Sequence, residues 1–499
     1  MAATNTGAGF DLSRFESFAK CAPIALVIAA LLWSCSSSTD STIAVTHVTV
    51  IDATGSPPQS HITVLIKGQN IAALGPSSAV GIPSQAHIVD GTGKFLIPAL
   101  ADMHVHLTGS GEPAGSREFI VPLLLANGIT TVRDMGGYLE SLVPLRQDIE
   151  KGKRLGPQIF FAGPYLDGNP PSFQPSLVVT NRQEAADAIH TLVPRGVDFI
   201  KVQSILSREA YFAIADICRR ERLTFVGHVP DRVTAAEASD AGQKSIEHLT
   251  DVLRACSSDE PRLMREQLET GSHTQTPAQS HVRQLAWQRE LLQSFSDQQA
   301  AALIAKFARN QTWQVPTLIL LRNVAFATPQ NNPVNDPDTK YIPRSLLQKW
   351  LAVRNQLITN ADAEEFAVRA GLLQKSMQVV AKMQSFGVLI MAGTDTGAPF
   401  LFPGSALHDE LALLVQAALT PMQALQAATK SPADFLGKSK TQGTIEPGKS
   451  ADLLLLDANP LEDIRKTRKI RALILHGKLL DRSALDDLLA IEMKFAGSN

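Results

Sequence analysis

The sequence predicts an α/β protein, in which a (β/α)8 barrel carries a small composite β-sandwich domain formed by N- and C-terminal segments. Three observations support this. A repeated unit of helix, glycine and short apolar strand fills the middle of the 499-residue chain, alternating strand-like segments precede it, and similar segments follow it. Hydrophobic residues make up 44% of the chain, which is enough for a large packed core.

In the middle region each predicted helix ends at a glycine, and an apolar strand follows. Glycine suits this position because it adopts the left-handed backbone conformation that often ends a helix. Together with the strand that begins at Phe95, the sequence offers eight strand candidates, the number that a (β/α)8 barrel requires. We therefore predict the barrel over residues 99–437. The glycines at the helix ends are Gly128, Gly196, Gly242 and Gly387.

The two ends of the chain share a different texture, with short strands of alternating polarity. Residues 42–98 contain such strands and a turn at Gly68–Asn70, and residues 438–482 resume the pattern with a hairpin corner at His476-Gly477. Because chain ends often meet in a fold, we predict that these two segments form one β-sandwich domain. Residues 483–499 are predicted to be a C-terminal tail.

The first 41 residues have the features of an export signal. The apolar stretch Ala22–Trp33 is too short to span a bilayer but fits the core of a signal peptide. The Leu-Trp-Ser-Cys sequence that ends at Cys35 resembles a bacterial lipoprotein cleavage box, with Trp33 as an atypical member. We therefore expect residues 1–41 to be a signal or lipoprotein-type leader and the protein to be exported, either lipid-anchored at Cys35 or periplasmic. Acidic residues in the long leader keep a cytoplasmic location as the alternative.

Composition excludes two functional classes. The chain has 46 Lys and Arg residues against 48 Asp and Glu residues, so it lacks the positive excess that nucleic-acid binding requires. Its four cysteines do not indicate a disulfide framework, because two of them lie in the leader. Cys218 falls in a helical pattern, where a buried, unreactive role is expected.

Ionisable side chains stand at the carboxyl ends of several predicted strands, where barrel active sites lie. The "DMHVHL" segment places two histidines at i and i+2, on one face of a strand. Each residue alone has a structural explanation, such as a core histidine, a buried ion pair or a helix cap. Their occurrence at equivalent points of a repeated unit predicts a metal site. The candidate ligands are His104, His106, Lys201, His228, His248 and Asp395.

This ordered pattern resembles the amidohydrolase superfamily, and within it the imidazolonepropionase-like group that includes metal-dependent dipeptidases. The resemblance covers nearly all of the chain after the leader, including the closing phrase "GTIEPGKSADLLLLDANP". It implies two divalent metal ions. It also implies that Lys201 bridges them as a carbamate formed with carbon dioxide. The remaining ligands would be His104, His106 and Asp395 for one ion, and His228 and His248 for the other.

The implied chemistry is consistent with the residue types. Two dications close together need an anionic bridge, which a carboxylated lysine provides and a neutral lysine does not. Imidazole and carboxylate ligands favour zinc, although they discriminate poorly among zinc, manganese and cobalt. Asp395 is the expected catalytic residue, accepting a proton from the attacking water and passing it to the departing amine. Supporting residues are expected in Asp102, Arg133 and Asp134, for which a structural salt bridge or loop anchor is an equally plain explanation.

We therefore predict a hydrolase that cleaves a C–N amide bond of a small molecule, such as a dipeptide or an N-acyl amino acid. One departure weakens the dipeptidase assignment, because relatives of that type carry a tyrosine shortly after the fifth-strand histidine and this chain has Val229-Pro230-Asp231. A lost oxyanion donor costs about 3 kcal/mol, so another group or the metal must replace it. Beyond the amide substrate, membrane attachment through the leader or lipid and homo-oligomer formation are the expected associations.

Three alternatives stay open. A mononuclear cyclic-amide hydrolase or deaminase would need only the His-x-His pair, one further histidine and Asp395, and Lys201 argues against it. A lactone or organophosphate hydrolase could use the same binuclear site. A non-catalytic binding protein on a degenerate barrel would be expected to lack at least one ligand, and every position is intact.

Overall fold

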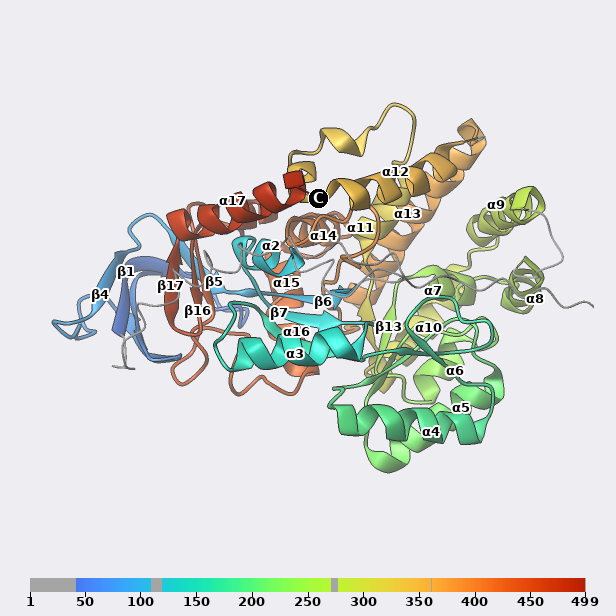
Figure 1. Cartoon of the computed structure of the whole chain (residues 1–499), viewed down its shortest axis with the longest axis horizontal. Helices are drawn as coiled ribbons and strands as arrows, with labels where there is room; N and C mark the ends of the chain where they lie inside the picture. Colours follow the sequence, from blue (N-terminus) through green and yellow to red (C-terminus); the bar gives the residue numbers. More distant parts are fainter. Residues whose placement is uncertain (1–41, 109–118, 271–276, 360, 499) are drawn as a thin grey trace, which may run out of the picture. The chain divides into compact units, whose positions relative to one another are not determined.

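The computed structural model describes residues 42–108, 119–270, 277–359 and 361–498, and the predicted leader lies outside these ranges. Within them the chain is a mixed α/β fold with three sheets (Figure 1). None of the helices in this part of the chain is long and apolar enough to cross a membrane.

The strands from the two ends of the chain belong to one sheet, with the order β17-β16-β15-β5-β1-β2-β3 and with β4 paired to β1. β15 runs antiparallel to β5, with Leu454 opposite Ile97, and the blue and red strands lie together in Figure 1. The predicted turns occur, since Gly68, His476 and Gly477 all have positive φ. The strands are β1 (Thr42–Val50), β2 (Gln59–Lys67), β3 (Asn70–Pro76), β4 (His87–Asp90), β5 (Phe95–Pro98), β15 (Leu453–Leu456), β16 (Ile470–Leu475) and β17 (Lys478–Asp481).

The middle of the chain forms two parallel sheets, with the orders β6-β7-β8 and β10-β9-β11-β12-β13-β14. Most of their residues are buried, as in parallel sheets that helices cover on both faces. Residues 157–166 (PQIFFAGPYL), which the sequence predicts as one strand, are divided into β8 and β9. The strands are β6 (Leu100–Val105), β7 (Ile129–Asp134), β8 (Gln158–Phe161), β9 (Tyr165–Asp167), β10 (Ser176–Val178), β11 (Ile200–Val202), β12 (Phe225–Gly227), β13 (Ser245–Glu247) and β14 (Trp313–Val315).

The predicted eighth strand is replaced by an irregular segment, residues 388–396, that links the two parallel sheets. Ile390 forms an isolated parallel bridge with Gln314 of β14, and Thr396 forms one with Val105 of β6. A positive φ of 63° at Asp395 prevents a regular extended strand here. The neighbours of this segment are those that an eighth barrel strand would have, and closure of the barrel stays a prediction.

Helices alternate with the parallel strands, and all four predicted helix-ending glycines have φ between 73° and 89°. The predicted C-terminal tail is a helix. The helices are α2 (Ile120–Ala126), α3 (Leu139–Glu150), α4 (Arg182–Leu192), α5 (Arg208–Glu221), α6 (Ala235–Asp240), α7 (Thr250–Ala255), α8 (Glu260–Thr270), α9 (Pro277–Gln293), α10 (Asp297–Asn310), α11 (Leu318–Ala325), α12 (Arg344–Ile358), α13 (Ala363–Ser385), α14 (Ser405–Gln416), α15 (Pro421–Ala427), α16 (Lys430–Phe435) and α17 (Arg482–Ser498), with short 3-10 turns η1 (Val193–Arg195), η2 (Pro333–Asn335), η3 (Pro337–Tyr341) and η4 (Ile464–Arg468).

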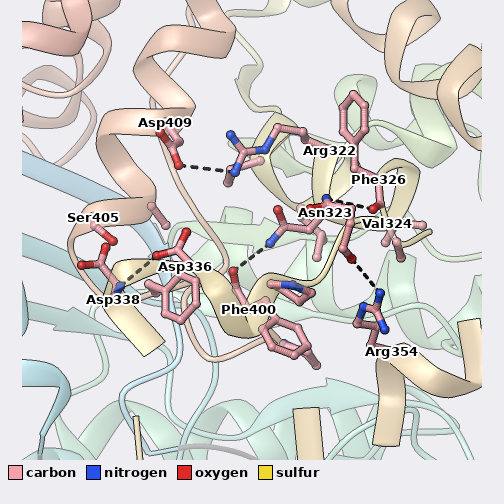
Figure 2. Close-up of a pocket in the computed structure, with 18 of the residues that line it drawn as sticks. Arg322, Asn323, Val324, Phe326, Asp336, Asp338, Arg354, Phe400, Ser405 and Asp409 are labelled. Carbon is pink, nitrogen blue, oxygen red and sulfur yellow. Dashed lines mark hydrogen bonds and ion pairs between the residues drawn. The ribbon is translucent and has the colours of Figure 1, made fainter. Parts of the chain in front are cut away.

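A cavity of about 700 Å³ lies beside α11, between this helix, the 3-10 turns η2 and η3, and α12 (Figure 2). Its walls also include five residues that follow the irregular eighth segment, namely Pro399, Phe400, Phe402, Ser405 and Ala406. None of the six predicted metal ligands, all of which are described, belongs to its lining. The cavity is therefore distinct from the site to which the sequence points.

Candidate metal centre

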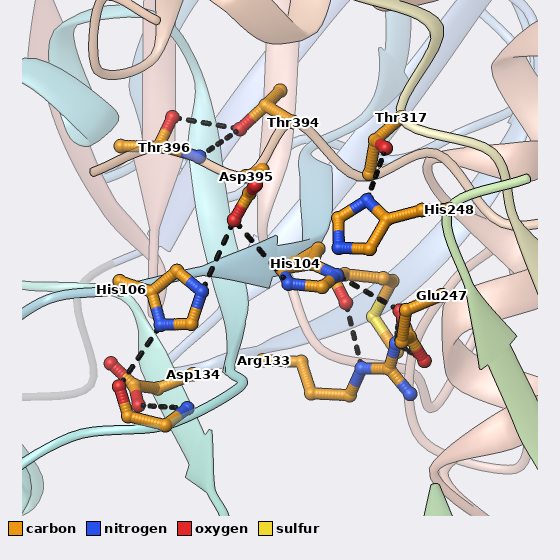
Figure 3. Close-up of polar contacts among 12 residues, drawn as sticks. His104, His106, Arg133, Asp134, Glu247, His248, Thr317, Thr394, Asp395 and Thr396 are labelled. Atoms are coloured by element: carbon orange, nitrogen blue, oxygen red, sulfur yellow. Dashed lines mark hydrogen bonds and ion pairs between the residues drawn. The ribbon is translucent and has the colours of Figure 1, made fainter. Parts of the chain in front are cut away.

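Three of the predicted ligands converge on one point. His104 lies on β6, His106 follows it, and Asp395 lies on the irregular segment beside β6. Asp395 Oδ1 is 3.4 Å from His104 Nε2 and 3.1 Å from His106 Nε2 (Figure 3). One ligand atom from each residue lies within 4.8 Å of the others, which is close enough for a single metal ion.

The Nδ1 atom of each of these histidines faces a hydrogen-bond acceptor. His104 Nδ1 lies 2.9 Å from Glu247 Oε2, and His106 Nδ1 lies 3.0 Å from the carbonyl oxygen of Gly136. A carboxylate and a carbonyl only accept hydrogen bonds, so both Nδ1 atoms carry the proton. The Nε2 lone pairs of both rings therefore face Asp395.

The second histidine pair is held in the same way. His248 Nδ1 lies 2.7 Å from Thr317 Oγ1, whose own proton goes to the carbonyl oxygen of Pro316, so the imidazole donates. His228 Nδ1 lies 3.0 Å from Ser204 Oγ, which points its proton at a neighbouring glutamine. Among the described residues, neither Nε2 atom has a hydrogen-bond partner. The His248 ring lies 4.8 Å from the ring of His104 and 4.9 Å from that of His228.

This donor set fits a cation. Burial lowers the pKa of His104, His228 and His248, which keeps these rings in the neutral form that binds metals. Burial alone would raise the pKa of Asp395, but the neighbouring histidines, His104 first, outweigh it and hold the pKa well below its ordinary value. Two lone pairs and a carboxylate facing each other repel unless positive charge lies between them. Burial lowers the pKa of His106, but the Asp395 carboxylate opposes burial, and the pKa is raised overall. This rise shows that the negative charge of Asp395 favours a positive charge at this point.

Lys201 lies on β11 beside this cluster and is 1% exposed. Burial lowers the pKa of its amine to about 8, against the opposing effect of the Glu247 and Asp395 carboxylates. A Cβ on Gly227 would lie 2.9 Å from the Lys201 side chain and 2.2 Å from the carbonyl oxygen of Val202, so glycine is needed there. The amine is therefore desolvated, tightly packed and partly neutral near pH 8, which carbamate formation requires.

The sequence predicts only part of the buried network that supports His104. Arg133, a predicted supporting residue, donates to Glu247 at 2.8 Å, to Ser245 at 2.9 Å and to the carbonyl oxygen of Met103 at 2.7 Å. The sequence analysis does not single out Glu247, although a glutamate in a buried strand is itself a signal because charged residues are rarely buried without a partner. The network thus orients the first ligand through a carboxylate that is itself held by a guanidinium.

The other two supporting candidates anchor backbone. Asp102 accepts hydrogen bonds from the backbone nitrogens of His104 and Thr394 and from Thr394 Oγ1, at 3.2, 3.0 and 2.6 Å. It thereby ties β6 to the segment that carries Asp395. Asp134 accepts from the backbone nitrogens of Leu107 and a glycine two residues on, at 2.7 and 3.1 Å. Both carboxylates therefore fix loops that present ligands.

Backbone strain is concentrated at the site. His248 and Asp395 both have positive φ, 64° and 63°, which is uncommon for residues with a side chain. The cost is offset by hydrogen bonds from their backbone nitrogens, His248 to the Val315 carbonyl at 2.9 Å and Asp395 to the His104 carbonyl at 2.7 Å. The strain turns both side chains toward the cluster.

No tyrosine follows His228 directly, and the chain has Val229-Pro230-Asp231 there. The Asp231 carboxylate accepts a hydrogen bond from Gln267 at 2.7 Å, and burial raises its pKa to about 7. Tyr165 supplies a different hydroxyl, 3.2 Å from His106 Nδ1. This hydroxyl contacts the outward side of the ligand ring.

The fold and the site define a class. The sequence profile of the Amidohydrolase family matches residues 95–480, and the chain belongs to this family. The prediction of the superfamily from the ligand pattern is confirmed, the imidazolonepropionase-like group fits, and the predicted enzyme class, a hydrolase acting on C–N bonds, is that of the family.

The individual proteins that resemble this chain share 29% sequence identity or less with it. Ochratoxinase from Aspergillus niger is 29% identical over 131 residues, which is 26% of this chain and 26% of that protein. Bottromycin amidohydrolase shares the fold with a TM-score of 0.71 and 20% identity, over 91% of each chain. A Xaa-Pro dipeptidase with bound methionine gives a TM-score of 0.63 and 21% identity, over 88% of this chain and all of the other.

Proposed function

We propose that the protein is a binuclear metal-dependent hydrolase that cleaves a C–N amide bond of a small substrate, such as a dipeptide or an N-acyl amino acid. The observation that carries the proposal is the cluster of unprotonated Nε2 atoms around Asp395, with the desolvated amine of Lys201 beside it. Family membership and relatives such as a Xaa-Pro dipeptidase support amide chemistry.

In this proposal the six predicted residues would hold two divalent ions, zinc being the preferred one. His104, His106 and Asp395 would hold the first ion and His228 and His248 the second, and Lys201, as a carbamate, would supply a ligand to both. The ions would polarise the substrate carbonyl and acidify water. The bridging anion is needed because two dications repel each other at short range.

The chain's own groups carry out the proton transfers and the positioning. Asp395 accepts the proton of the attacking water and delivers it to the departing amine, and its low pKa keeps it ionised before each turnover. Glu247 and Thr317 hold the imidazoles of His104 and His248 in the tautomer that leaves Nε2 free. Fixed ligands avoid reorganisation during the reaction.

The predicted location and organisation belong to the same proposal. Residues 1–41 would direct export and Cys35 would carry the lipid, while residues 42–98 and 438–482 would form one β domain around the barrel. Mass spectrometry of the mature protein tests the leader, since an intact Met1 would contradict it. Sedimentation of the purified protein tests the proposed homo-oligomer.

The reaction is tested with a panel of dipeptides, N-acyl amino acids, a cyclic amide, a lactone and a phosphotriester, using wild type and Asp395→Asn. We expect turnover of at least one linear amide, with kcat lowered at least 100-fold in the variant. Asp452→Asn is a matched control, because Asp452 is a carboxylate that pairs with His476 in the terminal sheet. Turnover of only the cyclic amide, or only the ester substrates, would transfer the assignment to the corresponding alternative.

A further inference from the structure

The cavity beside α11 has the size and lining of a binding site for a small molecule. Its volume of about 700 Å³ falls within the range of small-molecule pockets. It borders the elements that follow two parts of the metal centre, since α11 begins directly after Thr317, and Phe400 lies five residues after Asp395. No step of the proposed hydrolysis uses its residues.

One part of the lining is an exposed apolar surface. Phe326 is 52% exposed and Val353 is 42% exposed, although both belong to the cavity wall. Phe400 also lines the cavity, and its ring contacts that of Trp350 in a tilted arrangement with centroids 5.5 Å apart. Large apolar side chains left in contact with water inside a cavity favour a ligand with an apolar body.

One side of the cavity offers unpaired guanidinium donors. Arg322 makes a single side-chain hydrogen bond within the described chain, to Asp409 at 3.3 Å, and its other N–H groups are free. Arg354 is only 9% exposed, and its Nε has no partner, although its Nη2 holds the carbonyl oxygens of two loop residues. A buried guanidinium N–H without an acceptor is costly, and a ligand carboxylate would satisfy it.

Another part of the lining carries the two carboxylates of Asp336 and Asp338. Asp336 Oδ1 accepts the backbone N–H of Asp338 at 2.9 Å, and neither carboxylate has an ion-pair partner among the described residues. Burial, together with the Asp338 and Asp409 carboxylates, raises the pKa of Asp336 against the opposing effect of Arg468, which also lines the cavity and forms an ion pair with Asp409. Figure 2 shows Asp336 and Asp338 on one side of Phe400 and Arg354 on the other.

We propose that this cavity binds a zwitterion whose two charges are separated by an apolar body, as in an apolar dipeptide. The carboxylate meets Arg322 and Arg354, the ammonium meets Asp336 and Asp338, and the apolar body lies against Phe326 and Phe400. A lining with unpaired groups of both signs disfavours simple anions and simple amines, because each would leave the groups of one sign unpaired. This site does not rest on the proposed hydrolase activity.

The test uses 6-aminohexanoate, a zwitterion with no amide bond to hydrolyse, together with hexanoate and hexylamine, which each lack one charge. Calorimetric titration of the wild-type protein should show saturable binding of 6-aminohexanoate. Each single-charge analogue should bind at least tenfold more weakly, since a hydrogen bond to a charged group contributes about that factor or more.

Variants assign the two walls. Arg322→Gln should weaken the binding of 6-aminohexanoate and hexanoate at least tenfold and leave the binding of hexylamine unchanged. Asp336→Asn combined with Asp338→Asn should weaken the binding of 6-aminohexanoate and hexylamine at least tenfold and leave that of hexanoate unchanged. Arg309→Gln, an exposed arginine of α10, is the control and should change nothing. Arg322→Lys keeps the positive charge and should retain more 6-aminohexanoate binding than Arg322→Gln, which separates loss of the charge from a folding defect. Absence of saturable 6-aminohexanoate binding, or equal effects of Arg322→Gln and Arg309→Gln, would overturn the proposal.

Discussion

His104 donates its Nδ1 proton to Glu247 across the interior of the fold, at 2.9 Å and over 143 positions of sequence. Both side chains are at most 1% exposed, and Arg133 completes the chain of contacts with a hydrogen bond to the same carboxylate. The tautomer of the first metal ligand is therefore set by a residue on a different strand.

Replacing Glu247 by Gln should weaken metal binding. The amide keeps the size of the side chain but loses the charge that fixes the His104 proton, and loss of such a partner lowers metal affinity about 10- to 100-fold. Calorimetric zinc titration measures the change. Glu365→Gln is the matched control, because Glu365 is buried in an ion pair with Arg369 on α13 and its loss should lower stability without altering metal affinity.

Metal loading should depend on pH through Lys201. Only the neutral amine reacts with carbon dioxide, and with a pKa of about 8 its neutral fraction rises roughly 25-fold between pH 6.5 and pH 8.5. Protein stripped of metal should therefore recover two ions faster at pH 8.5 when bicarbonate is supplied, as followed by metal analysis over time. Lys201→Ala should show no dependence on bicarbonate, and equal recovery rates at both pH values in the wild type would contradict carbamate formation.

Gly227→Ala should damage the centre without touching a ligand. The new methyl group would meet the Val202 carbonyl at 2.2 Å, and a φ of 133° is unfavourable for alanine. We expect a loss of several kcal/mol in unfolding free energy and a reduced metal content. Gly81→Ala is the control, because nothing lies within 4 Å of its added Cβ, and it should leave both quantities unchanged.

Glu410 should make stability fall as pH rises. It accepts the backbone N–H groups of Leu318 and Ile319 at the start of α11, and burial raises its pKa from 4.5 to about 8 despite those bonds. Between these two values the folded state holds a proton that the unfolded state releases. The contribution of Glu410 therefore declines by up to about 1.4 kcal/mol per pH unit across that window.

Denaturant unfolding of wild type and Glu410→Gln between pH 5 and pH 8 checks the sign. The stability of the variant relative to wild type should increase with pH, since glutamine cannot ionise. A constant difference across the range would show that Glu410 does not retain its proton in the folded state.

The sequence predicts the parts of the site that repeat along the chain. His228 and His248 stand at equivalent strand ends, so the periodicity of the fold identifies them without knowledge of their contacts. Glu247 and Thr317 are different, because their roles depend on which strands become neighbours. The sequence around either residue does not predict that His104 pairs with Glu247.

The same limit applies to the irregular eighth segment and to the cavity. An apolar run before Asp395 predicts an extended strand, and only packing against His104 and Val315 at Gly393 explains the tight, irregular path. The cavity brings together Phe326 after α11, Asp336 between η2 and η3, and Phe400 before α14. Such surfaces arise from tertiary packing, which composition and periodicity do not specify.

The central claim is a binuclear centre that depends on Lys201, and its most direct test is elemental analysis of wild type and Lys201→Ala, both purified without chelator, alongside hydrolysis of the amide panel. We predict close to two divalent ions per wild-type chain, with loss of both the second ion and amide hydrolysis in the variant. One ion per chain in both proteins, with activity retained in Lys201→Ala, would contradict it and favour the mononuclear alternative.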